Sequence, residues 1–247
     1  MLGACHGGAD KAAPVRELAI YTSLPLFWAE SGDIAGALAQ DGPAHWALDA
    51  LVQEGGPKRG AIRPLDTLTS LEGMASLREH GVLLMVQPRP LSPQENVALD
   101  AWVRAGGHLL LFADPMLAMD SAFAPGDPRR PQDVALLSPI LGHWGLEMFF
   151  DPDQPPQDHA VALPEGALPV RLAGRLERFG KSGDTAAGDA PLASCAIGAA
   201  GLLADCSIGQ GRALILADAT LFDADASDTA ERGSVLRALI ARAYAQH

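Results

Sequence analysis

Residues 82–115 constrain the fold more than any other part of this sequence. They open with Val82-Leu83-Leu84-Met85-Val86, a continuous apolar run that is typical of a strand covered on both faces. Ser92-Pro93-Gln94-Glu95 then supplies a hydroxyl N-cap, a Pro at the first helical position and a Glu at N3. Gly106-Gly107 ends that helix, and Leu109-Leu110-Leu111-Phe112 is a second buried strand. Two strands joined by a helical crossover of this length must be parallel, so the sequence predicts a parallel α/β sheet.

Weaker patterns on both sides extend this unit into one domain. The spacing of apolar residues predicts strands at 17–22, 61–65, 146–150 and 212–217, and helices at 43–53, 71–80, 134–141 and 234–245. Short strand-like runs at 159–163, 193–197 and 202–206 are separated by Gly, Pro and Asp, which indicates an antiparallel elaboration. We therefore expect a leader or tether at 1–15 and a single domain at 16–247, with a β-rich insertion at about 151–206.

The charge of the chain excludes several classes of partner. Its 247 residues carry a formal net charge of −12 at pH 7. Nucleic-acid binding needs clustered Lys and Arg, and a domain held on anionic lipid by charge needs a basic surface. No apolar run approaches the roughly 18–20 residues of a membrane span. We expect protein partners, no nucleic acid and no cofactor, with membrane contact only through an anchor.

The first residues suggest what such an anchor would be. Leu2-Gly3-Ala4-Cys5 resembles a bacterial lipobox, in which a signal peptidase cuts before a cysteine that then carries lipid. The basic and apolar regions of a signal peptide do not precede it. Either the chain starts upstream of Met1 and is a lipoprotein on the periplasmic side of the cell envelope, or the match is a coincidence and the segment is a cytoplasmic leader.

Two further cysteines, Cys195 and Cys206, flank an expected hairpin. An even pair in an oxidising compartment can form a disulfide. In the simplest two-strand register, however, they do not face each other, so we expect two buried free thiols and keep the disulfide as the alternative.

Several short motifs resemble the auxiliary components of gliding-motility-type ABC transport systems, which belong to a wider group of glutamine-amidotransferase-like domains. These motifs are Tyr21-Thr22-Ser23-Leu24-Pro25, Leu91-Ser92-Pro93-Gln94-Glu95, Arg104-Ala105-Gly106-Gly107, Asp114-Pro115, Gly142-His143-Trp144-Gly145-Leu146 and Gly209-Gln210-Gly211-Arg212. The resemblance implies a flavodoxin-like fold with helices on both faces of the sheet. It also implies a place in an extracytoplasmic transport or envelope assembly, with the membrane subunits of an ABC transporter as partners.

The amidotransferase chemistry itself is not expected. Its nucleophilic cysteine belongs at the tight turn after the central strand, where backbone strain and a helix N-terminus lower its pKa. That turn reads Gln87-Pro88-Arg89-Pro90, without Cys, Ser or Thr. No His-x-Glu pair follows the last strand, where Asp218-Ala219-Thr220 stands. The resemblance therefore favours a non-catalytic binding or assembly subunit over an enzyme.

Ligands of open α/β sheets bind at the carboxyl ends of parallel strands. The residues expected to gather there are Ser23, Gln87, Arg89, Asp114 and Asp218, with Asp223 nearby. The aspartates could hold Mg²⁺ or Ca²⁺, or place a general base for a hydrolase. They could also merely cap local turns, as Asp commonly does. A metal-dependent hydrolase using Asp114 and Asp218, and a small-ligand sensor, thus remain as alternative functions.

Overall fold

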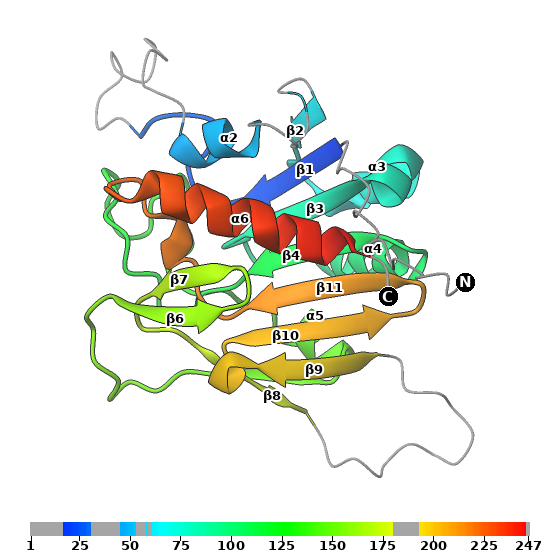
Figure 1. Ribbon diagram of the computed structural model, residues 1–247. Helices are drawn as coiled ribbons and strands as arrows, with labels where there is room; N and C mark the ends of the chain where they lie inside the picture. The colour runs from blue at the N-terminus through cyan, green and yellow to red at the C-terminus, as the bar shows by residue number, and fades with distance from the viewer. Residues whose placement is uncertain (1–16, 31–44, 53–57, 59–60, 180–192, 246–247) are drawn as a thin grey trace, which may run out of the picture.

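The protein is built on one seven-stranded sheet, and a computed structural model describes residues 17–30, 45–52, 58, 61–179 and 193–245 (Figure 1). The strand order is β2-β1-β3-β4-β11-β10-β9. Five neighbouring strands run parallel, and the last two pair antiparallel. The mixed α/β fold with a mostly parallel central sheet is therefore confirmed. The strands are β1 (Glu17–Thr22), β2 (Ile62–Pro64), β3 (Gly81–Val86), β4 (His108–Phe112), β9 (Ser194–Gly198), β10 (Leu203–Ile208) and β11 (Gly211–Leu216).

Helices cover both faces of this sheet. Along β4, Leu110 and Phe112 belong to one core cluster and Leu109 and Leu111 to the other, because successive side chains of a strand point to opposite faces. The first cluster holds α2 and α6, and Figure 1 shows α6 lying across β3, β4 and β11. The second cluster holds η2, α3, α4 and α5. Among the described residues no helix is long and apolar enough to cross a bilayer. The helices are α2 (Trp46–Leu51), the 3-10 helix η2 (Leu68–Gly73), α3 (Ala75–His80), α4 (Pro93–Arg104), α5 (Ser138–His143) and α6 (Thr229–Tyr244).

The central unit has the structure that its sequence predicts. Strands β3 and β4 pair in parallel and are fully buried. The capping box at the start of α4 is present in both directions, between the side chain and backbone of Ser92 and those of Glu95. A Cβ at Gly107 would collide with the ring of Trp102, so the second glycine after α4 is needed for close packing.

Two expectations for the second half of the chain need correction. The helix expected at 134–141 begins only at Ser138, because the backbone N–H of Ala135 donates to the carbonyl of Asp114 and ties this segment to the end of β4. Strands β9 and β10, expected within a separate insertion, extend the main sheet instead. The antiparallel ribbons outside that sheet pair β5 (Leu146–Phe149) with β8 (Arg175–Arg178) and β6 (His159–Leu163) with β7 (Gly166–Val170).

The expectation of two free thiols is also wrong. A 3-10 turn, η3 (Ala199–Gly201), joins β9 to β10 and places Gly198 opposite Leu203. In that register Cys195 lies opposite Cys206, and the two form a disulfide. The covalent link fastens the edge strand β9 to the rest of the sheet. Cys5 lies outside the described residues.

A single buried carboxylate joins the start of α4 to its surroundings. Glu95 Oε1 accepts hydrogen bonds from the Leu68 N–H at 3.3 Å and the Tyr21 hydroxyl at 3.4 Å. Oε2 accepts from the Ser92 N–H at 3.0 Å. The Arg89 guanidinium donates to both oxygens, at 2.8 and 3.1 Å. Burial by itself raises the pKa of Glu95, but the hydrogen bonds from Ser92, Arg89 and Leu68 outweigh it and lower the pKa to about 2.

This lowered pKa predicts a stability loss in acid. An ionised Glu95 stabilises the folded state above its ordinary pKa of 4.5, and that contribution disappears as the pH falls toward about 2. We expect it to be on the order of 2–3 kcal/mol. In chemical denaturation at a series of pH values, Glu95→Gln should show a correspondingly smaller fall in the free energy of unfolding between pH 4.5 and 2. Glu147 is exposed, so Glu147→Gln is the control and should lose as much unfolding free energy between pH 4.5 and 2 as the wild type does. If Glu95→Gln also loses as much as the wild type, the pKa of Glu95 is not lowered.

Candidate functional site

The residues expected at the carboxyl edge of the sheet do come together there, with one exception. Ser23 and Gln87 directly follow β1 and β3, and Asp114 and Asp218 stand two residues after β4 and β11. Hydrogen bonds join these residues to one another or to the adjacent backbone. Arg89 lies apart, in an ion pair with Glu95 and over the ring of Tyr21. Its guanidinium therefore supports the start of α4.

Gln87 stands at the turn that directly follows β3. Its φ of 42° lies in the left-handed region that few residues other than glycine adopt. The side-chain amide is fully buried and pairs twice with the backbone of Asp114, through Nε2 to the carbonyl (3.1 Å) and through Oε1 from the N–H (2.8 Å). Nε2 also donates to the Gln132 carbonyl at 2.7 Å. The backbone of this turn is strained, and the Gln87 side chain links the end of β3 to the end of β4.

The hydroxyl of Ser23 also links the turn at Gln87 to the loop that contains Gln132. It donates to the Gln87 carbonyl at 2.5 Å and accepts from the Gln132 N–H at 3.0 Å. Both of these partners are main-chain groups of loops that leave the sheet. Ser23 is thereby held between two loops, and its oxygen is engaged as both donor and acceptor.

The two aspartates are withdrawn from solvent and bound to backbone N–H groups. Asp114 accepts from Met116 at 2.8 Å and from Ala219 at 3.2 Å. Asp218 accepts from the N–H groups of Thr220 at 2.7 Å and Arg171 at 3.0 Å. Only 0% and 2% of Asp114 and Asp218 is exposed. Both carboxylates thus cap turns at the ends of β4 and β11.

Burial leaves these two carboxyls with unusual acidity. Desolvation raises the pKa of Asp114 to about 6, although hydrogen bonds from Met116 and Ala219 oppose it. Desolvation, followed by the nearby charge of Asp114, raises the pKa of Asp218. Within the described part of the chain, no group of three or more His, Cys, Asp or Glu side chains could hold a metal ion. A hydrolase would need one of these carboxylates to face a substrate, and both face the protein backbone.

The loops around this sealed edge carry exposed apolar side chains, a feature that our reading of the sequence missed. We call this set the apolar rim: Phe27, Trp28, Met116, Val134 and Leu136, each at least 38% exposed. Hydrogen bonds from Leu117 to Asp133 and from Ala135 to Asp114 hold two of these loops together, and the ring of Trp28 contacts that of Phe123. The sequence signal was present in the adjacent aromatics Phe27 and Trp28 after Pro25, where a turn exposes its residues.

Two cavities lined by described residues lie elsewhere. One of about 640 Å³ opens at the amino ends of β4 and β11, and another of about 500 Å³ lies between the β6–β7 ribbon and the start of β8. None of the five candidate ligand residues lines either cavity. Ligand binding by those five residues therefore stays a prediction.

Comparison with known proteins gives one informative match. Residues 62–165 match the model of a family described as "ABC-type uncharacterized transport system". This match confirms the resemblance to auxiliary components of ABC transport systems. No curated protein matches the chain.

Solved structures add only distant similarities. An exo-β-1,4-mannosidase from Opitutaceae bacterium strain TAV5 is 15% identical with a TM-score of 0.45, over 92% of this chain and 36% of that one. A β-galactosidase from Rahnella sp. R3 is 14% identical with a TM-score of 0.45, over 91% of this chain and 30% of that one. The chain thus spans about a third of the length of these glycosidases. A putative ThuA-like protein from Bacteroides uniformis is 14% identical with a TM-score of 0.40, over 96% and 94% of the two chains.

The raised pKa of Asp114 predicts a pH dependence of opposite sign to that of Glu95. A carboxyl whose folded pKa lies above its ordinary value of 3.8 supports folding while protonated, and this support is lost as the pH rises through about 6. We expect Asp114→Asn to remove a decline on the order of 2 kcal/mol in the free energy of unfolding between pH 4 and 8. The amide also loses one acceptor, which lowers stability at every pH, so the slope measured by denaturation is the readout. An unchanged slope would show that Asp114 is ionised throughout this range.

Proposed function

We propose that this chain is a non-catalytic binding or assembly subunit of a bacterial cell-envelope ABC-type transport or related system. The match of residues 62–165 to a transport-system family supports the setting. The proposed absence of catalysis rests on Gln87. The turn where an amidotransferase would carry its nucleophile holds this residue, whose side-chain amide is hydrogen-bonded to Asp114 and Gln132. A flavodoxin-like, amidotransferase-like architecture accounts for both the parallel sheet and this turn.

The alternative of a metal-dependent hydrolase draws no support from the site. Such an enzyme needs carboxylate oxygens that face a cation and a substrate. The oxygens of Asp114 and Asp218 accept backbone hydrogen bonds in a region closed to solvent. A protein partner can bind the surface around Asp114 and Asp218 without either carboxylate facing solvent.

The apolar rim is the surface that we assign to partner binding. Exposed apolar side chains that gather on one part of a protein surface mark interaction sites. The net charge of −12 opposes pairing with a second copy, because like charges repel, and favours a partner whose contact surface is apolar at its centre and basic around it. We assign this surface to the extracytoplasmic part of a transporter membrane subunit.

A charge placed on the rim should disrupt that association. We expect Trp28→Glu and Leu136→Glu to weaken by about tenfold or more the co-purification of this protein with the ABC permease of its host that wild-type protein retains, since burying an unpaired charge costs several kcal/mol. Val97→Glu is the matched control, because Val97 is 70% exposed on the outer face of α4, away from the rim. The proposal fails if wild-type protein retains no such permease, or if all three variants associate as wild type does.

We further propose a periplasmic location with a lipid on Cys5. The lipobox-like residues 2–5 support the anchor, and this requires a coding sequence that begins upstream of Met1. The disulfide between Cys195 and Cys206 supports an oxidising compartment, because such bonds are rare in the reducing cytosol. The resemblance to envelope transport components points to the same compartment.

Replacing the anchor residue should release the protein from the membrane. In the native host, the full-length protein is expected in the membrane fraction and to incorporate labelled palmitate, whereas Cys5→Ser should be soluble and unlabelled. Thiol labelling under non-reducing conditions should leave Cys195 and Cys206 unmodified in both proteins. Free thiols at these two positions together with soluble wild-type protein would place the chain in the cytoplasm.

A further inference from the structure

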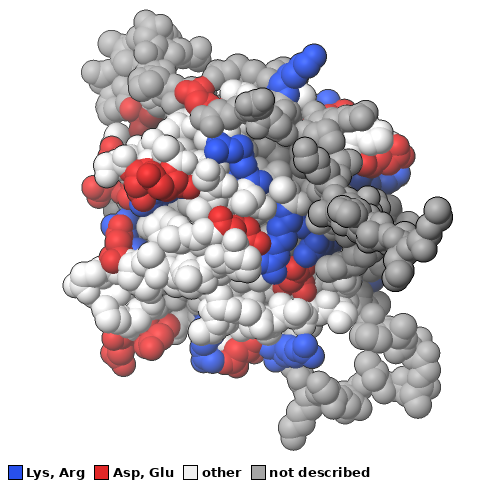
Figure 2. Space-filling model, in the orientation of Figure 1, with Lys and Arg blue, Asp and Glu red and all other residues white. Residues whose placement is uncertain are grey.

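Of the two large cavities, the one of about 500 Å³ has walls that suit a small molecule. It lies among the β6–β7 ribbon, the end of β5, the start of β8 and the η3 turn. Cavities that bind small molecules have volumes in this range and are lined mainly by apolar and aromatic side chains, with a few polar groups. Figure 2 shows the surface over the β6–β7 ribbon mostly free of Lys, Arg, Asp and Glu.

Apolar residues from separate segments line this cavity. Val170 and Leu202 are 1% and 5% exposed, and Val161 packs against the same core cluster. Phe149, from the end of β5, is 38% exposed. The apolar lining therefore runs from the core to the surface, and a ligand placed against it would bury apolar area.

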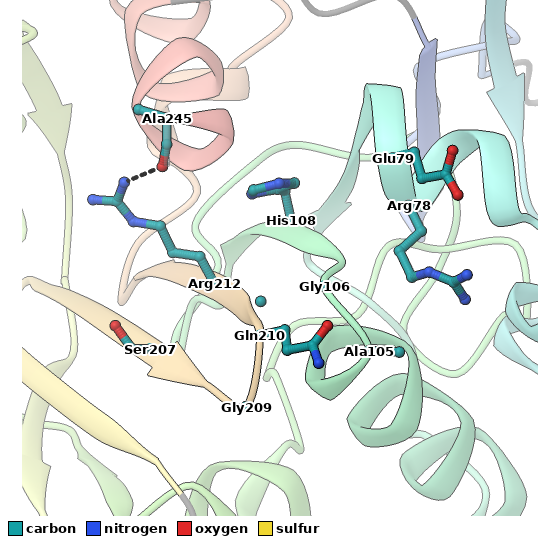
Figure 3. A pocket seen from close by; sticks show the side chains of 11 residues that line it. Arg78, Glu79, Ala105, Gly106, His108, Ser207, Gly209, Gln210, Arg212 and Ala245 are labelled. Atoms are coloured by element: carbon teal, nitrogen blue, oxygen red, sulfur yellow. Dashed lines mark hydrogen bonds between the residues drawn. The ribbon is translucent and has the colours of Figure 1, made fainter. Parts of the chain in front are cut away.

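The cavity of about 640 Å³ at the other edge of the sheet is built differently. Figure 3 shows the charged side chains of Arg78, Glu79 and Arg212 around it. An apolar molecule would gain little there, because those groups would lose water without gaining a partner.

The two charged residues that line the cavity of about 500 Å³ are already engaged. Arg175 forms an ion pair with Glu177 and lies over the ring of Phe149, 5.7 Å from its centre. The carboxylate of Asp151 accepts a hydrogen bond from the N–H of Asp153 at 3.0 Å. Their charges are opposite, so the lining has no net charge and favours neither an anion nor a cation.

Neutral polar groups also line the cavity. Gln154 Nε2 donates to the carbonyls of Ala173 at 2.9 Å and Asp151 at 3.0 Å, which fixes this amide in the wall. The exposed imidazole of His159 can donate or accept a hydrogen bond.

The backbone around this cavity is strained. Ala199 and Ala200 line it and have φ values of 50° and 55°, and Leu172, just before the lining residue Ala173, has a φ of 54°. Gln87 offsets its own left-handed backbone with side-chain hydrogen bonds, but an alanine has no polar side chain that could do so. Backbone strain of this kind clusters at ligand sites, so its presence here supports a binding role.

We propose that this cavity binds a neutral, mainly apolar small molecule, with its apolar body against Val161, Val170 and Leu202 and a hydroxyl or amide group toward His159. A ligand of about ten heavy atoms should bind with a Kd of about 0.1 mM. The lining shares no residue with the apolar rim, so this site stands or falls separately from the proposed function.

Titration with 2-naphthol, followed in ¹H–¹³C spectra of the Val and Leu methyl groups, tests the site. The probe should shift the methyl resonances of Val161, Val170 and Leu202 saturably and leave those of Val134 and Leu136, in the apolar rim, in place. The anionic analogue 2-naphthoate should bind at least about tenfold more weakly, since its charge would be desolvated without a free partner. No saturable shift at about 2 mM 2-naphthol, saturation confined to Val134 and Leu136, or tighter binding of 2-naphthoate would overturn the proposal.

Filling the cavity from one strand should block it. Val161→Trp should weaken 2-naphthol binding at least about tenfold, because the larger side chain occupies the space of the ligand. Ala162→Trp is the matched control: successive side chains of β6 point to opposite sides, Ala162 is exposed and does not line the cavity, and this variant should bind as wild type does. Equal binding by the two variants would reject the site.

A truncation provides a second test that does not depend on how Val161→Trp folds. Phe149→Ala should weaken 2-naphthol binding about fivefold, since it removes an aromatic wall. Phe179→Ala removes an equally large side chain that is 60% exposed and lies outside the cavity, so it should bind as wild type does. Thermal unfolding of each variant shows that it is folded, and equal binding by these two variants would also reject the site.

Discussion

The buried, ionised carboxylate of Glu95 is the interaction on which the rest of this structure depends. Its partners come from the turn after β3 and the start of α4, which are close to it in the sequence, and from β1 and η2, which are not. A buried carboxylate is costly unless its lone pairs are filled and an opposite charge lies close. Arg89 supplies the charge, and backbone and hydroxyl donors fill the lone pairs. The position of the central helix is therefore fixed electrostatically as well as by packing.

The two edges of the sheet are built in contrasting ways. At the carboxyl edge, Gln87, Asp114 and Asp218 turn inward and satisfy backbone groups, which closes the place where α/β folds usually bind ligands. At the amino edge, the β10–β11 turn packs directly on the end of α4; a Cβ on Gly209 or Gly211 would collide with that helix or the chain just after it. This close approach leaves an adjoining space lined by polar side chains.

Much of this was predictable from the sequence, because local patterns decide it. The apolar runs of β3 and β4 and the capping box at Ser92 define the central unit by themselves. The site was less predictable, since its properties are tertiary. That Asp114 faces Ala219 instead of solvent depends on segments 105 residues apart in the chain. The register that places Cys195 opposite Cys206 is set by the turn at η3. The alternation of apolar residues does not predict the geometry of that turn.

The strained turn at Gln87 closes the carboxyl edge of the sheet. A left-handed residue other than glycine costs about 1–3 kcal/mol, and at Gln87 three side-chain hydrogen bonds offset that cost. A cysteine or serine there is too short to reach the backbone of Asp114, and its N–H would be left buried without a partner. The closed edge therefore depends on the length of the Gln87 side chain, which holds the strand ends together. A shorter side chain at this position would leave the backbone of Asp114 without its two partners and open the edge.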